Sequence, residues 1–236
     1  MAPPSYFDEF AADYEAALGQ GLSVTGEEKD YFAHGRIAWL ARCLRALGER
    51  PRYVLDYGCG TGSSSKLALD LLEPESVVGV DNSARSLEIA RQVHDSPNFK
   101  FLLPGDYTAA EKLDLVYCNG VFHHIPTDQR ADAVEYIFNR LKPGGLFSLW
   151  ENNPWNPGTR LVMSRIPFDR DAITLSCFQA RRLLRARFEI VRTDFLFIFP
   201  RLFKRLRAVE PYISRLPLGG QFQVLCRKPL ASPAES

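Results

Sequence analysis

Residues 54–62 read VLDYGCGTG, and this stretch decides the fold. With Tyr53 it opens as a short apolar run, which predicts a β-strand, and residues 67–72 place four apolar side chains on one face of a helix. Glycines at a strand-to-helix turn permit positive φ and let a ligand approach the backbone closely. The start of the helix supplies unpaired N–H donors. The stretch therefore predicts a ligand-binding turn at the end of a strand.

The spacing of the glycines distinguishes two classes of ligand. A dinucleotide site needs the pattern GxGxxG, because the third glycine lets the helix pack closely while the pyrophosphate lies at the helix end. Here Gly58, Gly60 and Gly62 give the pattern GxGxG, and Ser63 stands where the third glycine would fall. The stretch instead resembles motif I of the class I S-adenosylmethionine-dependent methyltransferases. A nucleotide-dependent oxidoreductase is therefore the weakest of the functions considered.

Short apolar runs alternate with helical segments along most of the chain. Strands are expected at residues 53–55, 76–80, 99–103, 113–118, 146–150, 188–199 and 221–227. Helices are expected within residues 5–47 and at 67–72, 84–93, 127–141, 176–187 and 201–215, with Thr127 as a cap. This alternation predicts a parallel sheet covered by helices on both faces, and right-handed crossovers then give a doubly wound α/β fold.

An acidic residue follows the second predicted strand. Asp81 comes directly after residues 76–80 and nineteen residues beyond Gly62, close to the ~20 residues expected for an acid that binds ribose. Ligands of open α/β sheets bind at this carboxyl edge of the strands. The alternative is a cap on the following helix, a role that Asn82 or Ser83 could fill equally.

A second acidic residue follows the third strand, within Gly105-Asp106-Tyr107. A carboxylate there can accept the hydrogen of adenine N6, and the ring of Tyr107 can flank the base. The alternative is a plain turn, which Gly-Asp also favours. In series with motif I and Asp81, the binding interpretation is preferred.

Residues 114–126 (DLVYCNGVFHHIP) and 141–147 (LKPGGLF) also resemble methyltransferase motifs. Five ordered motifs therefore lie between Tyr53 and Trp150. The resemblance implies a Rossmann-like fold with a seven-stranded, mostly parallel sheet, an antiparallel last strand and an N-terminal helical lid. It also implies S-adenosyl-L-methionine as the cofactor.

The functional positions of the family carry over to this chain residue by residue. The resemblance implies that Asp56 and motif I hold the methionine tail, that Asp81 binds the ribose, and that Asp106 binds the adenine. Residues 119–120 lie beside the sulfonium in the family, and Tyr14 resembles the tyrosine of the lid. The implied cofactor-binding residues are Tyr14, Asp56, Gly58, Cys59, Gly60, Gly62, Asp81, Asn82, Asp106, Tyr107, Asn119 and Gly120.

Two adjacent histidines are candidates for acid–base chemistry. His123 and His124 follow the fourth strand, and histidine titrates near the working pH of most enzymes. Either could remove a proton from a hydroxyl acceptor or orient that acceptor, and the alternative is that both pack at the start of a helix. Glu151, at the end of the fifth strand, is a second catalytic candidate, against a structural hydrogen bond to the following turn.

Aromatic residues near the strand ends suggest an apolar acceptor pocket. Phe122, Trp150 and Trp155 could line it, although aromatics at such positions also belong to cores. Residues 153–155 (NPW) resemble the NPP(Y/F/W) motif of amino-directed DNA methyltransferases. That motif belongs after the fourth strand, where this chain has residues 119–122, so nucleic acid is not expected as a substrate.

Charge is distributed unevenly, although the net charge is +1. Residues 160–207 contain twelve Arg or Lys and four Asp or Glu, which indicates either a solvated basic face or an anionic acceptor, an acidic carrier protein or a membrane surface. In the predicted helix 201–215, Leu202, Phe203 and Leu206 recur at helical spacing. Packing of this face on the sheet is preferred over membrane contact.

The chain is expected to divide into a helical lid (1–48), a cofactor-binding core (49–230) with a helical insertion near 200–216, and a flexible tail (231–236). The five cysteines form no CxxC pair, so neither a zinc site nor a disulfide framework is indicated, and no metal is expected. The N-terminus lacks the apolar segment of a signal peptide, and no run of ~18 apolar residues is present. These features predict a cytoplasmic protein.

Residues 151–157, 167–169 and 217–222 resemble the substrate-side signature of a bacterial small-molecule subgroup of the family. The sequence as a whole therefore predicts methyl transfer from S-adenosylmethionine to a small acceptor, by O- or N-methylation, in biosynthetic metabolism. The alternative is a module with the same fold that binds the cofactor or a partner without transferring a methyl group.

Overall fold

The computed structural model describes residues 25–109, 112–169 and 172–230, so Tyr14 and much of the predicted lid lie outside the described residues. The strands are β1 (Tyr53–Tyr57), β2 (Ser76–Val80), β3 (Phe99–Leu102), β4 (Leu113–Asn119), β5 (Leu141–Asn152), β6 (Glu189–Leu196) and β7 (Gln221–Arg227). The α-helices are α2 (Lys29–Leu47), α3 (Ser63–Leu72), α4 (Ala84–Val93), α5 (Arg130–Arg140), α6 (Pro157–Met163), α7 (Cys177–Leu184) and α8 (Glu210–Ile213). Two 3₁₀ segments complete the fold, η3 (Phe122–His124) and η4 (Arg201–Val209).

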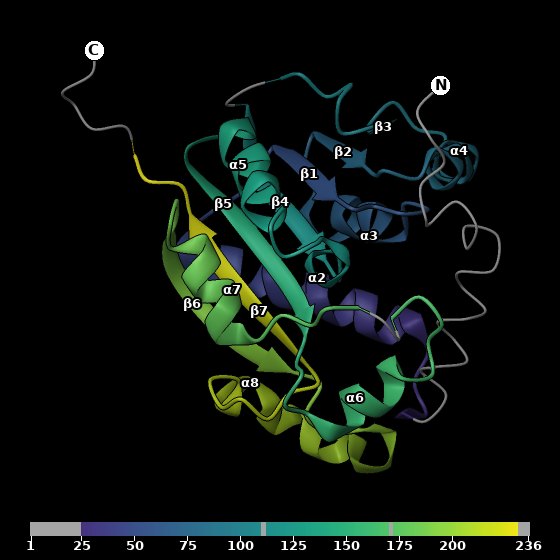
Figure 1. Ribbon diagram of the computed structural model, residues 1–236, viewed down its shortest axis with the longest axis vertical. Coiled ribbons are helices and arrows are strands. Elements are labelled where there is room, and N and C mark those ends of the chain that lie inside the picture. The colour runs from purple at the N-terminus through teal and green to yellow at the C-terminus, as the bar shows by residue number, and fades with distance from the viewer. Residues whose placement is uncertain (1–24, 110–111, 170–171, 231–236) are drawn as a thin grey trace.

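All seven strands form one sheet in the order β3-β2-β1-β4-β5-β7-β6 (Figure 1). The first five pair in parallel, whereas β7 runs antiparallel to both β5 and β6. The predicted doubly wound, mostly parallel sheet with an antiparallel last strand is therefore confirmed. Because the chain moves outward from β1 and then returns to β4 on the other side of β1, the carboxyl ends of β1 and β4 border the crevice in which such sheets bind ligands.

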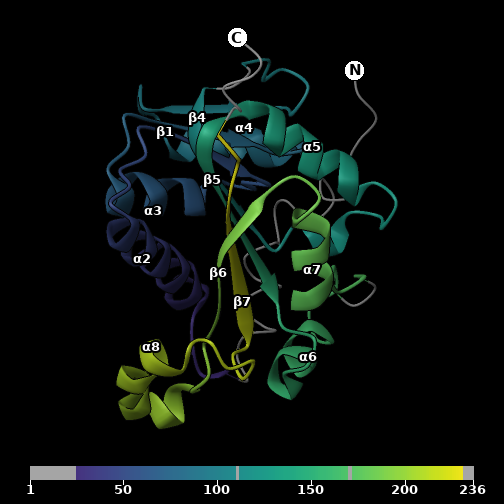
Figure 2. The same cartoon turned by 90° about the vertical axis from the view of Figure 1, so that its left-hand side faces the viewer.

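Helices cover both faces of the sheet, with α2 and α3 on one side and α5 and α7 on the other (Figure 2). On the α2 side, Ile37 and Leu40 are fully buried in one cluster with strand residues such as Leu115. On the other side, Ile137 and Leu184 are fully buried in a second cluster. Burial of each such side chain stabilises the fold by about 1.5–3 kcal/mol relative to exposure. The two cores hold the strands rigidly and so fix the loops at their ends.

Helix α2 ends where the sequence indicates, at Gly48. This glycine adopts φ 73°, and its N–H donates to the carbonyls of Leu44 and Arg45. The buried face of α2 makes the helix part of the layer that covers the sheet. A functional division of the chain at residue 48 remains a prediction.

Two local predictions are wrong. Helix α5 is capped by Gln129 rather than Thr127, and neither side chain makes a capping hydrogen bond to it. Strand β5 does not begin at residue 146 but at Leu141, and a bulge in its pairing with β4 absorbs residues 142–145. Pro143, Gly144 and Gly145 therefore lie within an irregular strand.

The segment 201–215 differs most from its prediction. It is 3₁₀ helix over η4 and a single α-helical turn in α8, and Leu202, Phe203 and Leu206 are 84%, 51% and 47% exposed, so they do not pack on the sheet. The reason is a tether at the end of β6: the buried Glu210 carboxylate accepts hydrogen bonds from the N–H groups of residues 197–199 at 3.0–3.2 Å. Among the described residues, no helix has the length and apolarity needed to cross a membrane.

Candidate functional site

The turn after β1 shows why glycines are needed there. Gly58 and Gly62 adopt φ 77° and 83°, in the left-handed region. A Cβ on Gly58 would lie 2.2 Å from Cγ2 of Val121, whereas a Cβ on Gly60, at φ 52°, would meet nothing within 4 Å. Gly58 is therefore required by packing, while Gly60 leaves open space above the turn. That space is the place where a ligand can approach the backbone.

Asp81 lies at the carboxyl end of β2 and holds this turn. Its Oδ2 accepts a hydrogen bond from the N–H of Gly60 at 2.8 Å, and its Oδ1 accepts one from the N–H of Ser83 at 2.8 Å. Ser83, rather than Asp81 or Asn82, is the cap of α4, because its Oγ accepts from the N–H of Ser86. Asp81 is thus partly exposed beside the turn, with both carboxylate oxygens oriented by backbone donors.

Asp56 supports the turn from below. It is 2% exposed, and its Oδ2 accepts a hydrogen bond from the hydroxyl of Ser65 on α3 at 2.7 Å. Burial raises the pKa of Asp56 to about 7, although the hydrogen bond from Ser65 opposes this shift. Asp56 ties the turn to α3 through this hydrogen bond and lines neither of the two cavities described below, so its role in holding the methionine tail remains a prediction.

Two neighbouring cavities lie at this edge of the sheet. The larger has a volume of about 460 Å³ and lies between the glycine turn, α2, α6 and the segment that follows β6. The smaller, of about 130 Å³, includes Asp81, Asn82 and Pro104 in its wall. The residues that line both cavities are Gly58, Gly60, Thr61, Asn119, Gly120 and His124. Residues of the glycine turn and of the end of β4 therefore line both cavities.

Of the remaining predicted cofactor residues, one lines the larger cavity and two line neither cavity. Cys59 lies in the wall of the larger cavity with its neighbours in the turn. Asp106 is exposed in a turn and Tyr107 packs against the core, and neither lines a cavity. The carbonyl of Tyr107 instead accepts hydrogen bonds from the guanidinium of Arg140. A role of Asp106 and Tyr107 in adenine binding remains a prediction.

Arg36 is a site residue that the sequence pattern did not reveal. Arg36 is 7% exposed and lines the larger cavity. The guanidinium donates to two neutral groups, the hydroxyl of Tyr117 at 3.3 Å and Oε1 of Gln221 at 3.0 Å. In the sequence, Arg36 is a cation next to Ile37 within the apolar stripe of a helix. Only the packed structure shows that Arg36 faces the cavity.

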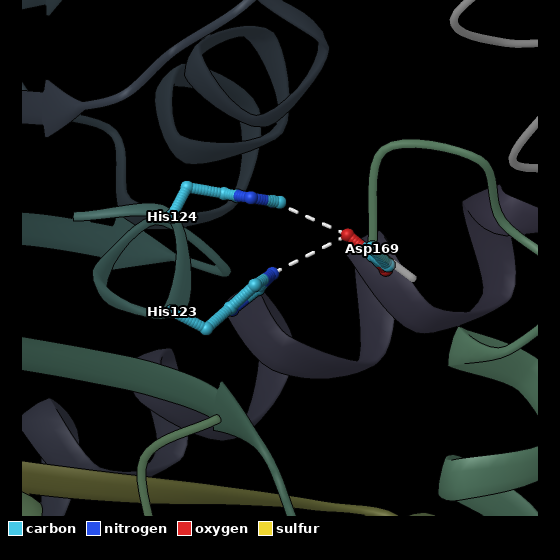
Figure 3. A group of neighbouring side chains, drawn as sticks. All are labelled: His123, His124 and Asp169. Carbon is cyan, nitrogen blue, oxygen red and sulfur yellow. Dashed lines mark hydrogen bonds and ion pairs between the residues drawn. The ribbon is translucent and has the colours of Figure 1, made fainter. Parts of the chain in front are cut away.

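His123, His124 and Asp169 meet in the wall of the larger cavity (Figure 3). The Nε2 atoms of His123 and His124 lie 3.4 Å and 3.2 Å from Oδ1 of Asp169. The second ring nitrogen of His123, Nδ1, lies 2.6 Å from Oε2 of Glu151. The other carboxylate oxygen of Glu151, Oε1, accepts a hydrogen bond from the N–H of Phe122 at 2.8 Å. The two histidine rings have centroids 4.0 Å apart.

The two carboxylates control the ionisation of His123. Burial alone would lower the pKa of His123, but Glu151 and Asp169 outweigh it and raise the pKa to about 10. Burial would likewise raise the pKa of Asp169, but hydrogen bonds with both histidines lower it to about 2. The catalytic roles of His123, His124 and Glu151 remain predictions. Glu151 bonds to η3 and not to the turn that follows it.

The three predicted substrate aromatics do not line the cavities. Phe122 and Trp150 are fully buried in the two cores, because they lie at the junctions between the sheet and its helices. Trp155 is 48% exposed and contacts the ring of Phe178, with centroids 5.3 Å apart. The wall opposite the histidines is instead formed by Met163 and other residues of the α6 region.

Comparisons with known proteins agree with this geometry. Residues 54–145 match the model of a methyltransferase domain. A trans-aconitate 2-methyltransferase from Rhodopseudomonas palustris is 29% identical over 120 residues, which cover 51% of this chain and 46% of that protein. A malonyl-[acyl-carrier protein] O-methyltransferase from Halalkalibacterium halodurans is 30% identical over 121 residues, 48% of this chain and 44% of that protein. The chain thus matches about half the length of these relatives.

The fold has a solved counterpart of similar extent. A chain from the solved "complex between the Haloferax volcanii Trm112 methyltransferase activator and the putative methyltransferase" superposes with a TM-score of 0.64 at 21% identity, over 97% of this chain and 100% of that chain. This likeness concerns the fold. It extends through the part of the chain that follows residue 145, where the domain model does not match.

Proposed function

Since residues 54–145 form a class I S-adenosylmethionine-dependent methyltransferase domain, we propose that this chain transfers a methyl group from S-adenosylmethionine to a small acceptor that carries a carboxylate. The observation that carries the proposal is that the larger cavity is lined both by the glycine turn and by the histidine wall, which consists of His123, His124 and Asp169 supported by Glu151. One end offers backbone and acidic groups to a nucleoside, and the other end leaves room for a second molecule.

The residues of the turn fit the cofactor. The open space above Gly60 admits a ligand to the backbone, and Asp81 in the smaller cavity suits the hydroxyls of a ribose. Asn119 and Gly120, which lie between the two cavities, suit the methionine portion. Arg36 suits the carboxylate of the methionine tail, because a guanidinium can donate two parallel hydrogen bonds to a carboxylate. When bound, the cofactor supplies an electrophilic methyl group.

The relatives favour a carboxylate acceptor. One is named for trans-aconitate and the other for a malonyl group on a carrier protein, and both acceptors contain carboxylates. A carboxylate is ionised at neutral pH, so its oxygen needs no base before it attacks a methyl group.

The chain's contribution is then mainly positional. Holding an acceptor oxygen in line with a methyl group can supply several kcal/mol of the barrier. The histidine wall and α6 bound the space opposite the turn, and Arg207 lines the same cavity, where it forms an ion pair with Glu27 at 2.7 Å. An acceptor linked to a carrier would need the open side of this cavity, whereas a free acid would not.

The experiment is an assay for S-adenosylhomocysteine with a panel of free dicarboxylic and tricarboxylic acids, acyl-carrier thioesters, and amines. We expect release of S-adenosylhomocysteine only with the carboxylates. The matched control is Gly60→Arg, which fills the open space and should abolish the reaction. Release with amines alone would overturn the acceptor class, while cofactor binding without turnover on any panel member would favour the non-catalytic module.

A further inference from the structure

We propose that His123, His124 and Asp169 bind a divalent transition-metal ion, with zinc as the best match, in the wall of the larger cavity. Imidazole nitrogens and carboxylate oxygens are the ligands that zinc and neighbouring metals prefer in open sites. The absence of cysteine pairs had indicated no metal site. The three candidate ligands come from two segments that the sequence separates and the fold brings together.

The spacing of the ligand atoms suits one ion. Oδ1 of Asp169 lies 3.4 Å from Nε2 of His123 and 3.2 Å from Nε2 of His124, and the ligand atoms of the group all lie within 4.8 Å of one another. Ligands bound at ~2.1 Å around a tetrahedral ion lie roughly 3.4 Å apart. The present contacts therefore need little adjustment to enclose a cation instead of hydrogen atoms.

Glu151 provides the outer support that metal-bound histidines need. Its Oε2 lies 2.6 Å from Nδ1 of His123, while its other oxygen is held by the N–H of Phe122. A carboxylate at Nδ1 keeps the proton on that nitrogen and leaves Nε2 as the ligand atom. Because Glu151 is 2% exposed and lines no cavity, its orientation serves His123 rather than an acceptor.

The charge of the group matches a divalent ion. Metal ligation requires neutral imidazoles, so Glu151 and Asp169 together contribute two negative charges. The side chains of His123, Glu151 and Asp169 are 3%, 1% and 8% exposed, which makes uncompensated charge costly. One divalent cation balances the two carboxylates while both imidazoles stay neutral.

The segment that carries Asp169 is anchored to the histidines. The carbonyl of His123 accepts a hydrogen bond from the N–H of Ile173 at 3.0 Å, and the carbonyl of Ile173 accepts one from the guanidinium of Arg130 at 2.6 Å. The N–H of Asp169 donates to the carbonyl of Ile166. The ligands are thus held in place by bonds that do not involve the proposed ion.

Access comes from the cavity, because all three ligands line it. Three protein ligands leave one position of a tetrahedral ion for water or for an incoming group. That an acceptor carboxylate takes this position rests on the proposed function. Binding of the ion itself does not, since it can be measured without cofactor or acceptor.

The test is a titration of the full chain, first treated with a chelator, with Zn²⁺ in competition with a chromophoric chelator. We expect one ion per chain for the wild type. His124→Ala and Asp169→Asn should weaken binding at least as much as the ~10–100-fold that is typical when an outer-shell partner is lost. His34→Ala, on the exposed side of α2, is the matched control and should bind like the wild type.

Cobalt substitution gives a readout that needs no variant. Co²⁺ bound by two histidines and a carboxylate should show visible ligand-field bands in the wild type, and Asp169→Asn should lose them while its thermal unfolding remains cooperative. The proposal is overturned if the wild type binds less than one ion per chain, or if His124→Ala and Asp169→Asn bind Zn²⁺ as tightly as His34→Ala. Neither outcome would alter cofactor binding at the glycine turn, so the two proposals fail separately.

Discussion

The two sides of the cavity are built in different ways. On one side, the turn 58–62 consists of consecutive residues and leaves open space above Gly60, whose N–H donates a hydrogen bond to Asp81. On the other side, the histidine wall combines side chains that lie 28 and 46 residues apart in the chain. The first side depends on the absence of side chains and the second on their charges, so the two should respond differently to substitution.

The largest effect is expected at Glu151. Glu151→Gln removes a buried carboxylate that bonds to His123 and to the N–H of Phe122, and breaking a buried charged pair typically costs about 3–5 kcal/mol. Urea unfolding should show this loss. The control is Glu135→Gln, which breaks an exposed ion pair with Arg187 and should cost less than ~1 kcal/mol. Equal effects in the two variants would mean that the histidine wall contributes no more than a surface pair.

The glycine turn should be sensitive to size rather than to charge. Gly58→Ala introduces a Cβ that collides with Val121 at a positive φ, and we expect a loss of about 2–4 kcal/mol in the free energy of unfolding. Gly105→Ala is the control, because its Cβ would meet nothing within 4 Å, and it should change stability by less than ~0.5 kcal/mol. If Gly58→Ala unfolds like Gly105→Ala, the account of the turn is wrong.

Asp56 should make the free energy of unfolding depend on pH. Its pKa is raised by burial to about 7, so its contribution to stability is complete below pH ~4, where the carboxyl is protonated in both states, and is lost as pH rises through 7. The slope is at most ~1.4 kcal/mol per pH unit. Asp56→Asn should remove this slope. Denaturant midpoints of both proteins between pH 4 and 8 measure the difference, and parallel curves would contradict the assignment.

The smallest effect is expected in η4, at an exposed residue that lines neither cavity. Leu202 is 84% exposed, so Leu202→Ala should change the free energy of unfolding by less than ~0.5 kcal/mol. Leu184→Ala, at a fully buried position of α7, should cost about 2–5 kcal/mol. A large loss for Leu202→Ala, measured by thermal unfolding, would show that η4 packs on the fold after all.

The same contrast explains how much could be predicted from the sequence. The positions of the strands along the chain, the turn 58–62 and the place of Asp81 after a strand follow from local patterns, since periodicity and glycine spacing are properties of neighbouring residues. The contact of Asp169 with the histidines and the inward orientation of Arg36 depend on packing between distant segments. The periodicity of the local sequence does not indicate such packing. The burial of Trp150 and the exposure of Leu202 depend on packing for the same reason, because an apolar residue alone does not reveal what lies against it.

The central claim is that the open backbone at Gly60, beside Asp81, is the cofactor site. Calorimetric titration of S-adenosylmethionine into the wild type and into Gly60→Arg tests it most directly, with thermal unfolding of both proteins as the check on folding. The account predicts micromolar-range binding to the wild type, on the usual scale of enzyme–substrate affinities, and none to a folded Gly60→Arg variant. Equal binding by the two proteins would contradict it.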